Sequence, residues 1–481
     1  MTILTMRGAR RGVAALAASA LALSGVVLAP AALAVAPGCL VSNDATHVGY
    51  RDLNAALSAA APGATLTIKG TCIASNVPAY SNADFMIWDD VTLKGVANKV
   101  FGTPTLMGTG EGTVVGVVGS AVTLIRLTIT GAGGNRSNGG LFNDHGVVTI
   151  VNSTVTGNSA WTAAGIGNNG TMVLSHSTIS DNTAVCGGGG IYNAGSLTMT
   201  DSEVSGNTST RCVGGGIFNF NNCVYEGSGI LTVADSTFSG NTAAQSGGAI
   251  LNQGYWNTYV ERSCLGAVTL TDSTISDNTA NIGGGISNAG TVTIADSTVS
   301  GNTTFLVGGS GGYGGGIATV RGYMADPAVL TVTNSTISDN AAAGMGGGIV
   351  NGLGHLDGSV AVLSGSTVSG NTSPYIGGGI SNWGTLAVEG SDFAANVGRF
   401  GGAIANQGAL TFSSLTTTIG GNTGTGYAGG ILNGGGTVVG GCPTVLGQAV
   451  PPSTTRTGFV VYDPPNIAGS DYYKDYNGFS C

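Results

Sequence analysis

Residues 283–303 read GGGISNAGTVTIADSTVSGNT and form one copy of a unit that fills most of this chain. Short alternating runs in this unit, such as residues 292–295, are separated by Gly, Asn, Asp and Ser, a pattern that predicts strand, turn and strand. The shortest repeat steps are about 24 to 26 residues, and a repeat of that period predicts a solenoid. Aligned copies place one apolar residue at the same point of each unit: Leu141, Ile166, Ile191, Ile217, Ile250, Ile286, Ile317, Ile349, Ile380, Ile404 and Ile431.

The composition is rich in glycine and poor in charge, with 86 Gly among 481 residues and 8% charged residues. Such a composition can indicate a flexible low-complexity polymer. Here, however, β-branched residues recur at fixed positions in every unit and can bury a continuous core. Because a solenoid grows by adding coils and needs no second core, we expect one elongated all-β domain.

The first 36 residues are typical of a secretory signal peptide. Arg7, Arg10 and Arg11 precede an apolar run at residues 13–28, and small residues follow at 32–36. The paired arginines lack the flanking residues of a twin-arginine signal, which favours the general export route, and the residues before Cys39 form a poor lipidation motif. No later stretch reaches the roughly 18 apolar residues that span a bilayer. We therefore expect a secreted, extracellular protein, either released or loosely associated with the cell wall.

The charge balance restricts the partners. The formal net charge of −9 becomes −12 when the three signal arginines are removed. An acidic chain with few lysines argues against nucleic acid and anionic membranes as partners. Glycans, cations and surface proteins remain open. We expect a monomer without a cofactor.

Eight cysteines in an exported chain favour disulfides. Cys186 and Cys212 each lie five residues before the repeat isoleucine, so they occupy one position on adjacent coils about 4.8 Å apart, a spacing that a disulfide tolerates. Cys223 and Cys264 both lie in insertions that follow the same turn of neighbouring coils, and we expect them to pair. The pairs expected to close the two ends of the solenoid are Cys39 with Cys72 and Cys442 with Cys481.

The chain before the regular units predicts a cap. Helical spacing of apolar residues at 50–57 predicts a short helix that covers the open end of the solenoid, and the alternation at 64–69 predicts a strand. Four regions follow from these patterns: the signal peptide at 1–36, the N-terminal cap and first coils at 37–100, the β-helix at 101–440 and a C-terminal cap or tail at 441–481.

Two asparagines recur in each unit, one after the isoleucine turn and one in Ser-Gly-Asn or Ser-Asp-Asn. Stacked amides can donate and accept hydrogen bonds along a fibre axis, so these columns predict structural ladders rather than a binding site. The first column is Asn143, Asn168, Asn193, Asn219, Asn252, Asn288, Asn351, Asn382, Asn406 and Asn433, and the second is Asn158, Asn182, Asn207, Asn241, Asn278, Asn302, Asn340, Asn371, Asn396 and Asn422.

Residues 238–250 and 393–404 each carry Phe-x-x-Asn followed by Gly-Gly-Ala-Ile. These segments resemble the paired FxxN and GGAI motifs of the polymorphic outer membrane proteins, and the likeness extends over most of residues 138–433. The resemblance implies a secreted, surface-exposed or adhesive protein, although Ile or Val replaces the Phe in other units and residues 451–481 are too few for an outer-membrane barrel. Together with the repeat period, it predicts a right-handed parallel β-helix of roughly 12 to 14 coils.

The motifs of common cofactor and metal sites are missing from the sequence. No Gly-Lys-Ser or Gly-Lys-Thr follows the glycine-rich turns, and these turns lack the aspartate of calcium-binding nonapeptides. The four histidines show no metal-ligand spacing. We therefore predict no metal site.

One aspartate column leaves a cation open as an alternative. Like charges about 5 Å apart disfavour joint ionisation unless a cation or turn amides compensate. Asn152 and Asn334 hold the same position, however, which favours turn capping. The acidic members are Asp201, Asp235, Asp272 and Asp296.

Four insertions follow the same turn on coils between Ile217 and Ile349, and insertions in a solenoid often form its binding surface. Their aromatic and acidic side chains suit sugar rings and hydroxyls, so we predict extracellular binding of a glycan or surface protein rather than catalysis. The candidate residues are Tyr225, Glu226, Tyr255, Trp256, Tyr259, Glu261, Arg262, Arg321, Tyr323, Asp326, His355 and Asp357.

Three alternatives to this binding hypothesis stay open. The loops can serve only to cover strand edges. A polysaccharide-degrading β-helix enzyme, a glycosidase or lyase, would need two carboxylates, roughly 6.5 to 9.5 Å apart in an inverting glycosidase, but no pair is singled out. Finally, the outward threonines of one strand can form an ice-binding array, which we expect to be interrupted. The array is Thr198, Thr232, Thr269, Thr293 and Thr331, and the interruptions are Ala234, Ala295, Ala387 and Glu389.

Overall fold

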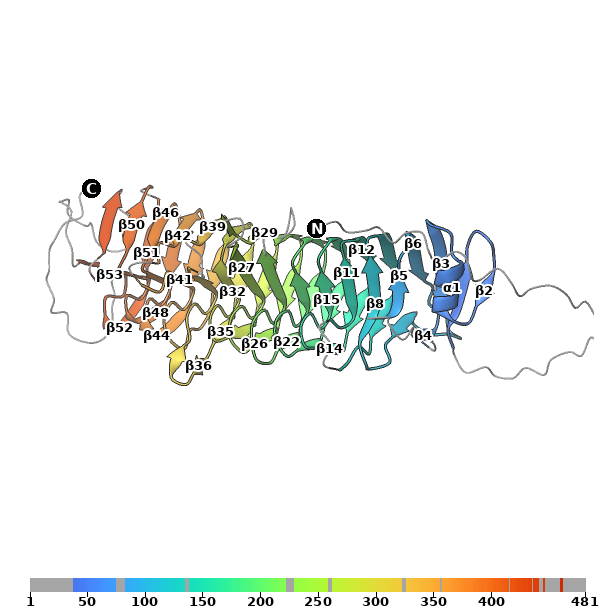
Figure 1. The fold of residues 1–481 in the computed structure, drawn as a ribbon. Helices are drawn as coiled ribbons and strands as arrows, with labels where there is room; N and C mark the ends of the chain where they lie inside the picture. Colours follow the sequence, from blue (N-terminus) through green and yellow to red (C-terminus); the bar gives the residue numbers. More distant parts are fainter. Residues whose placement is uncertain are drawn as a thin grey trace, which may run out of the picture. The chain divides into compact units, whose positions relative to one another are not determined.

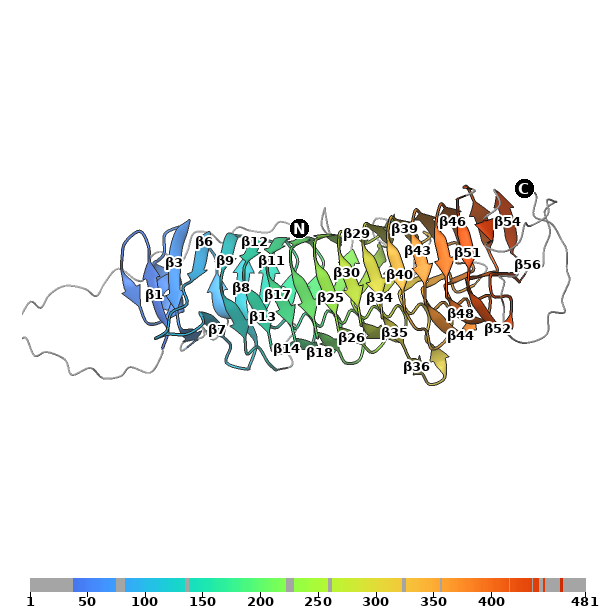
Figure 2. The same ribbon diagram turned by 180° about the vertical axis from the view of Figure 1, so that it is seen from behind.

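The repeat unit folds into one coil of a parallel β-helix in the computed structural model, as Figures 1 and 2 show from opposite sides. In the unit quoted above, Ile286–Ala289, Thr291–Ala295 and Thr298–Ser300 are three strands of three different sheets, named C, A and B. The structure describes residues 38–74, 83–134, 138–221, 229–257, 262–321, 326–354, 357–414, 416–434, 436–440, 444–445 and 459–461. All of them belong to the unit Pro37–Cys481, and the preceding unit, Met1–Ala36, lies outside the described residues.

Sheets A and B stack one strand from each coil. Sheet A runs β2 (Gly49–Tyr50), β1 (Leu40–Asn43), β3 (Ala64–Lys69), β6 (Val91–Gly95), β9 (Ala121–Ile125), β12 (Val147–Val151), β16 (Thr171–Ser175), β20 (Ser196–Thr200), β24 (Ile230–Ala234), β29 (Ala267–Thr271), β33 (Thr291–Ala295), β39 (Val329–Thr333), β42 (Val360–Ser364), β46 (Thr385–Glu389), β50 (Ala409–Phe412) and β54 (Thr437–Gly440). Sheet B runs β4 (Thr71–Ile73), β7 (Thr105–Met107), β10 (Thr128–Thr130), β13 (Thr154–Thr156), β17 (Thr178–Ser180), β21 (Glu203–Ser205), β25 (Thr237–Ser239), β30 (Thr274–Ser276), β34 (Thr298–Ser300), β40 (Thr336–Ser338), β43 (Thr367–Ser369), β47 (Asp392–Ala394), β51 (Thr418–Gly420) and β55 (Thr444–Val445).

Sheet C carries the repeat isoleucines, and short strands complete the coils. Sheet C runs β5 (Ala83–Ile87), β8 (Thr113–Val118), β11 (Leu141–Asp144), β15 (Ile166–Asn168), β19 (Ile191–Asn193), β23 (Ile217–Asn221), β27 (Ile250–Asn257), β32 (Ile286–Ala289), β38 (Ile317–Thr319), β41 (Ile349–Asn351), β45 (Ile380–Asn382), β49 (Ile404–Asn406), β53 (Ile431–Asn433) and β56 (Phe459–Val461), with β28 (Arg262–Cys264) beside β27. The short strands are β14 (Ser159–Ala160), β18 (Thr183–Ala184), β22 (Thr208–Ser209), β26 (Thr242–Ala243), β31 (Thr279–Ala280) and β35 (Thr303–Thr304) in one sheet, β44 (Thr372–Ile376), β48 (Val397–Phe400) and β52 (Thr423–Tyr427) in a second, and the pair β36 (Leu306–Val307) and β37 (Ser310–Gly311).

The predicted register is confirmed along the whole isoleucine column. Each apolar residue of that column pairs with its counterpart on the next coil, from Leu141 with Ile166 through Ile404 with Ile431. The column also continues into the irregular early coils, where Phe85 and Val115 pair in parallel. Of the 16 strands of sheet A, β1 and β2 are antiparallel, so the described residues contain 14 coils. The predicted parallel β-helix and its number of coils are therefore confirmed.

The core is one continuous cluster of apolar side chains inside the coils. Phe238 and Phe393 of the Phe-x-x-Asn motifs are buried in a single column of sheet B, and the same column holds Ile or Val in other coils, such as Ile275. Replacement of Phe by Ile or Val therefore changes the filling of the core but leaves the fold unchanged. The turn that leads into sheet C needs glycine. Gly283 has a φ of +62°, and a Cβ there would lie 2.2 Å from the Ile286 carbonyl oxygen.

Both predicted asparagine ladders are present and buried. In the first ladder, Asn143 Nδ2 donates to Asn168 Oδ1 at 2.8 Å, and most later coils repeat this bond. In the second, Asn278 Oδ1 accepts from both the side chain and the backbone N–H of Asn241, each at 2.9 Å. The asparagine amides thus provide hydrogen-bond partners for buried polar groups on successive coils. Apolar core side chains cannot provide such partners.

A third ladder consists of serines and was not predicted. From Ser177 onward, each serine hydroxyl accepts from the backbone N–H of the serine one coil earlier, as when Ser273 N donates to Ser297 Oγ at 3.0 Å. The hydroxyl then donates to the carbonyl oxygen two residues before it in its own coil, as Ser273 does to Thr271 at 2.7 Å. The members are Ser153, Ser177, Ser202, Ser236, Ser273, Ser297, Ser335, Ser366 and Ser391.

The predicted N-terminal helix is α1 (Leu53–Ala59), which buries Leu53 and Ala56. Asp52 caps it by accepting from Ala55 N at 3.0 Å, a bond that satisfies one of the first-turn amides. The following strand, β3, matches the predicted residues 64–69, and β1 pairs with it antiparallel. A strand and a helix therefore cover the N-terminal end of the stack.

Two predicted disulfides are confirmed, Cys39–Cys72 and Cys186–Cys212, with Cα separations of 4.4 and 4.7 Å. Cys264 is disulfide-bonded, and its predicted partner Cys223 lies outside the described residues. The expected pair of Cys442 with Cys481 also lies outside the described residues.

Candidate functional site

The four insertions follow strands of a single sheet. They come directly after β23, β27, β38 and β41 of sheet C, and each leads to the next strand of sheet A. In the strand order, β23 neighbours β27 and β38 neighbours β41, with β32 between the two pairs. The insertions therefore leave the same end of nearby parallel strands, and together they are called the insertion face.

The described residues cover part of this face. β27 continues into its insertion and pairs antiparallel with β28, so that Trp256 lies opposite Ser263. Tyr255 lies in β27 and Arg262 in β28. Six further candidates of the insertion face lie outside the described residues: Tyr225, Glu226, Tyr259, Glu261, Tyr323 and His355.

One contact joins two insertions. The Asp357 carboxylate accepts hydrogen bonds from Arg321 N at 3.0 Å, from Leu353 N at 3.1 Å and from the Ser359 hydroxyl. This carboxylate therefore fastens the insertion after β41 to the insertion after β38, and its acceptor positions are used structurally. Asp326 is exposed and makes no hydrogen bond to the other described residues.

An aromatic cluster lies beside the first insertion and was not predicted. Tyr192 of β19 contacts Phe218 of β23 edge to face at 5.3 Å between ring centroids, and Phe218 and Phe220 are 5.4 Å apart. All three side chains are partly exposed, whereas the flanking Ile191 and Asn193 are fully buried. Burial raises the pKa of Tyr192 to about 12. Tyr192 and Phe218 occupy the position after the repeat isoleucine, so aligning that column in the sequence would have found these two residues.

The turn from sheet A to sheet B holds the aspartate column in an open groove. A groove of about 560 Å³ is lined by His176, Asp201, Glu203 and Asp235 among others, and His176 Nε2 lies 3.6 Å from Asp201 Oδ2. The His176 and Asp201 side chains are 59% and 52% exposed, and ion pairs in contact with water contribute little to stability. This groove therefore gives no particular support to the enzyme alternative.

The prediction that the aspartate column caps turns by hydrogen bonding is wrong. Among the described residues, none of the four aspartates accepts a hydrogen bond from a turn amide. Instead their backbones are left-handed, with φ between 47° and 50°, a conformation that Asp and Asn tolerate better than most residues. The same conformation explains Asn152 and Asn334 at this position. Within the described residues, no group of three or more His, Cys, Asp or Glu is arranged to hold a metal ion.

Comparison with known families identifies the repeats. Residues 176–194 and 235–253 match the model of the Chlamydia polymorphic membrane protein repeat. The chain is a parallel β-helix with repeats of this type. The two segments include Tyr192 of the aromatic cluster and the Phe-x-x-Asn unit at 238–250. Searches of curated proteins and of solved structures gave no match.

The expected threonine array needs a correction in its register. The column through Thr198, Thr232 and Thr269 is interrupted by valines and by Ala387. The predicted interruptions Ala234, Ala295 and Glu389 are wrong, because these residues belong to a column two positions further along the strands. A more continuous column lies on sheet B, where Glu203 and Asp392 interrupt it: Thr71, Thr105, Thr128, Thr154, Thr178, Thr237, Thr274, Thr298, Thr336, Thr367, Thr418 and Thr444.

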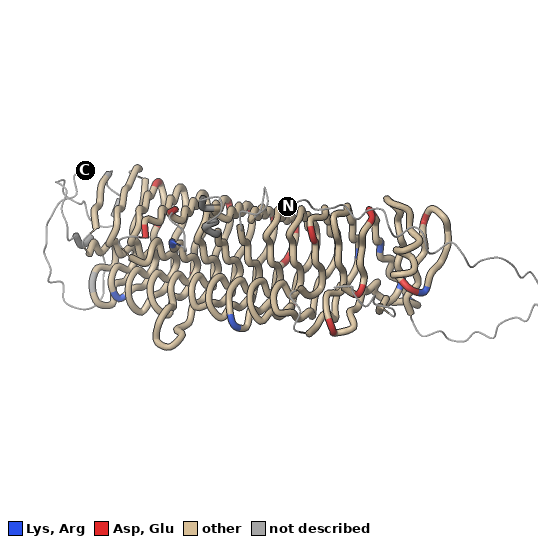
Figure 3. The backbone as a smooth tube through the Cα atoms, viewed as in Figure 1, with Lys and Arg blue, Asp and Glu red and all other residues tan. Residues whose placement is uncertain are grey.

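Charged residues are sparse along the coils, as the colouring of the backbone in Figure 3 shows. Within the described part of the chain, no helix is long and apolar enough to cross a membrane.

Proposed function

We propose that this chain is an exported, adhesion-type protein that binds an extracellular glycan or surface partner through the insertion face. The observation that carries the proposal is the aromatic cluster of Tyr192, Phe218 and Phe220 beside the insertion after β23. Ile, Val and Leu already fill the core at neighbouring positions, so partly exposed aromatic rings on the other side of these strands add contact area for a ligand.

Three further observations support an extracellular role. The repeats match those of a family named for membrane proteins. Disulfides persist in oxidising compartments outside the cytosol, and the described residues contain two complete ones. The sequence begins with a pattern typical of an export signal. A glycan is the favoured ligand because aromatic faces stack on sugar rings, while few charged groups are present to recognise a highly charged partner.

The test is a retention assay on a panel of polysaccharides that also measures new reducing ends and unsaturated products. We expect retention without cleavage. Phe220→Ala should weaken retention about fivefold, and Trp256→Ala should weaken it most, because tryptophan offers the largest stacking area. The matched control is Trp161→Ala, which removes a 45% exposed tryptophan that belongs to neither the aromatic cluster nor the insertions.

Three outcomes contradict glycan binding through the insertion face. Cleavage products would favour the enzyme alternative, and their loss in Glu226→Gln, Glu261→Gln or Asp326→Asn would locate the acids. Retention that both Phe220→Ala and Trp256→Ala keep would place the ligand elsewhere. Finally, failure of the whole panel would leave a protein partner or a purely structural role for the insertions.

A further inference from the structure

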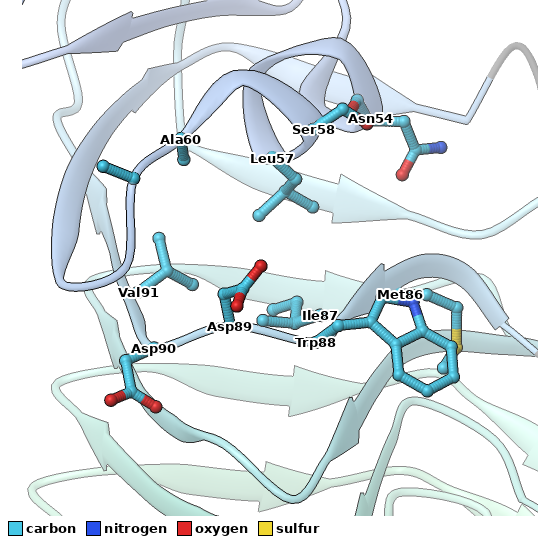
Figure 4. A pocket seen from close by; sticks show the side chains of 11 residues that line it. Asn54, Leu57, Ser58, Ala60, Met86, Ile87, Trp88, Asp89, Asp90 and Val91 are labelled. Carbon is cyan, nitrogen blue, oxygen red and sulfur yellow. The ribbon is translucent and has the colours of Figure 1, made fainter. Parts of the chain in front are cut away.

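We infer that a small pocket at the N-terminal end of the β-helix binds an organic cation, such as a substituted ammonium group. The pocket has a volume of about 210 Å³ and lies between α1 and the turn that joins β5 to β6. Figure 4 shows its two walls, with Asn54 and Leu57 from the helix on one side and residues 86–91 on the other. This site is separate from the insertion face, and the inference does not rest on the proposed function.

The first argument is the exposed tryptophan. Trp88 is 64% exposed, compared with 45% for Trp161, although burial of this side chain would contribute strongly to stability. It lies in the turn from sheet C to sheet A, the same turn that carries the insertions further along the chain. A tryptophan face attracts cations more strongly than any other aromatic side chain does.

The second argument is the charge beside the indole. Asp89 and Asp90 follow Trp88 directly, and no Lys or Arg lines the pocket. The Asp90 carboxylate is fixed in place, because it accepts from Ala121 N at 2.8 Å. Asp89 is exposed and has no hydrogen-bond partner among the described residues, and Figure 4 shows its carboxylate turned toward Leu57. A cation in the pocket would therefore face the Asp89 carboxylate and the indole, with the Asp90 carboxylate adding negative charge nearby.

The third argument is an open acceptor. The Asn54 amide donates to the Asp84 carbonyl oxygen at 3.0 Å, and the Ser58 hydroxyl donates to the Asn54 carbonyl oxygen at 2.8 Å. Both polar groups of the helix wall are thus engaged within the protein, while the Asp89 carboxylate accepts no hydrogen bond from the other described residues. A cation needs only acceptors and a π face, which Asp89 and Trp88 supply.

The apolar lining selects among cations. Leu57, Met86 and Ile87 line the pocket together with the charged and aromatic groups. Methyl groups on a substituted ammonium would contact these side chains, whereas a hydrated sodium or ammonium ion would lose its water without an equal return. We therefore expect choline and tetramethylammonium to bind and simple inorganic cations to bind far less.

The experiment is calorimetric titration of the full chain with tetramethylammonium chloride and with choline chloride. We expect millimolar affinity, since one partly exposed aromatic contact and solvated carboxylates contribute modestly. Trp88→Ala should weaken binding about tenfold. Asp89→Asn should weaken binding about threefold. Added salt should also weaken the binding of both ammonium compounds to the wild-type protein. Trp161→Ala is the matched control and should bind as the wild type does.

The controls separate this idea from its rivals. Trp88→Phe keeps an aromatic face and should retain part of the affinity, and circular dichroism of each variant should match the wild type because the side chain is exposed. Equal binding of glucose, or binding that Trp88→Ala leaves unchanged, would overturn the inference. No binding of either ammonium compound to the wild type would also overturn it. Addition of phosphatidylcholine vesicles then distinguishes a lipid headgroup from a free cation as the source, since capture by vesicles must depend on Trp88 in the same way.

Discussion

Thr319 interrupts the first asparagine ladder. It pairs with Asn288 on one side and with Asn351 on the other, where every other coil from Leu141 to Ile431 places an asparagine. Asn288 Nδ2 consequently donates only to the Val329 carbonyl oxygen, at 2.8 Å. The Thr319 hydroxyl and Asn351 Oδ1 are both buried without a hydrogen-bond partner. One substitution thus leaves two polar atoms unpaired, which costs free energy.

Thr319→Asn should therefore stabilise the protein. The new amide would accept from Asn288 and donate to Asn351, and we expect an increase of about 1 to 2 kcal/mol in the free energy of unfolding. Guanidinium unfolding followed by circular dichroism measures it. Thr319→Val is the control, since it removes the buried hydroxyl but leaves Asn351 Oδ1 unpaired. Its free energy of unfolding should increase less than that of Thr319→Asn. An unchanged midpoint for Thr319→Asn would show that the gap is already satisfied, for example by water.

Tyr192 should make the fold sensitive to high pH. Its pKa is raised from 10.0 to about 12 because burial disfavours the phenolate. A group whose folded pKa is raised contributes its full stability below the unfolded pKa, so this contribution is present below about pH 10 and is lost as the pH rises toward 12. Tyr192→Phe should flatten the fall in stability over that window. A wild-type and variant pair with the same alkaline profile would contradict the burial of this ring.

The disulfide Cys186–Cys212 ties β19 to β23 through the turns that precede them. It joins residues 26 positions apart, about one coil, in the turns that precede the two strands carrying Tyr192 and Phe218. The Cys186→Ser and Cys212→Ser double variant should lose about 3 kcal/mol of stability through the looser unfolded chain. Because coils in a solenoid interact mainly with their neighbours, we expect faster hydrogen exchange in these two coils and little change near Ile404. Uniform loss of protection along the stack would argue against local coupling.

Most of the repeating elements and the N-terminal helix could be predicted from the sequence, whereas side-chain arrangements that join unlike segments could not. The isoleucine column and both asparagine ladders were predicted because each coil imposes the same environment on the same position. The serine ladder was missed because serine also suits turns, and left-handed backbone rather than capping explains the aspartates. The Trp88 pocket depends on α1 folding back onto a turn more than 30 residues later, and no periodic signal connects these two segments.

Across the whole unit, each coil depends on the coils before and after it. The described part of sheet A stacks 14 parallel strands, which at ~4.8 Å per strand gives a length of about 60 Å. The confirmed features of the fold all lie along this axis: the core, three ladders and two disulfides. The insertion face and the N-terminal pocket instead do not repeat from coil to coil. Their ligands must therefore be found by experiment.

The strands that end the sheets also affect how copies of the chain meet. At one end β1 runs antiparallel to β3 of sheet A and the two-residue β2 runs antiparallel to β1, and at the other end β56 runs antiparallel to β53 of sheet C. A parallel β-helix without such ends is a template, because the exposed edge of its last coil can recruit the first coil of another molecule and propagate into a fibre. Reversed strands break the parallel hydrogen-bonding pattern at which a second copy would join. We therefore expect a protein built on the same stacking as amyloid to remain a particle of fixed length.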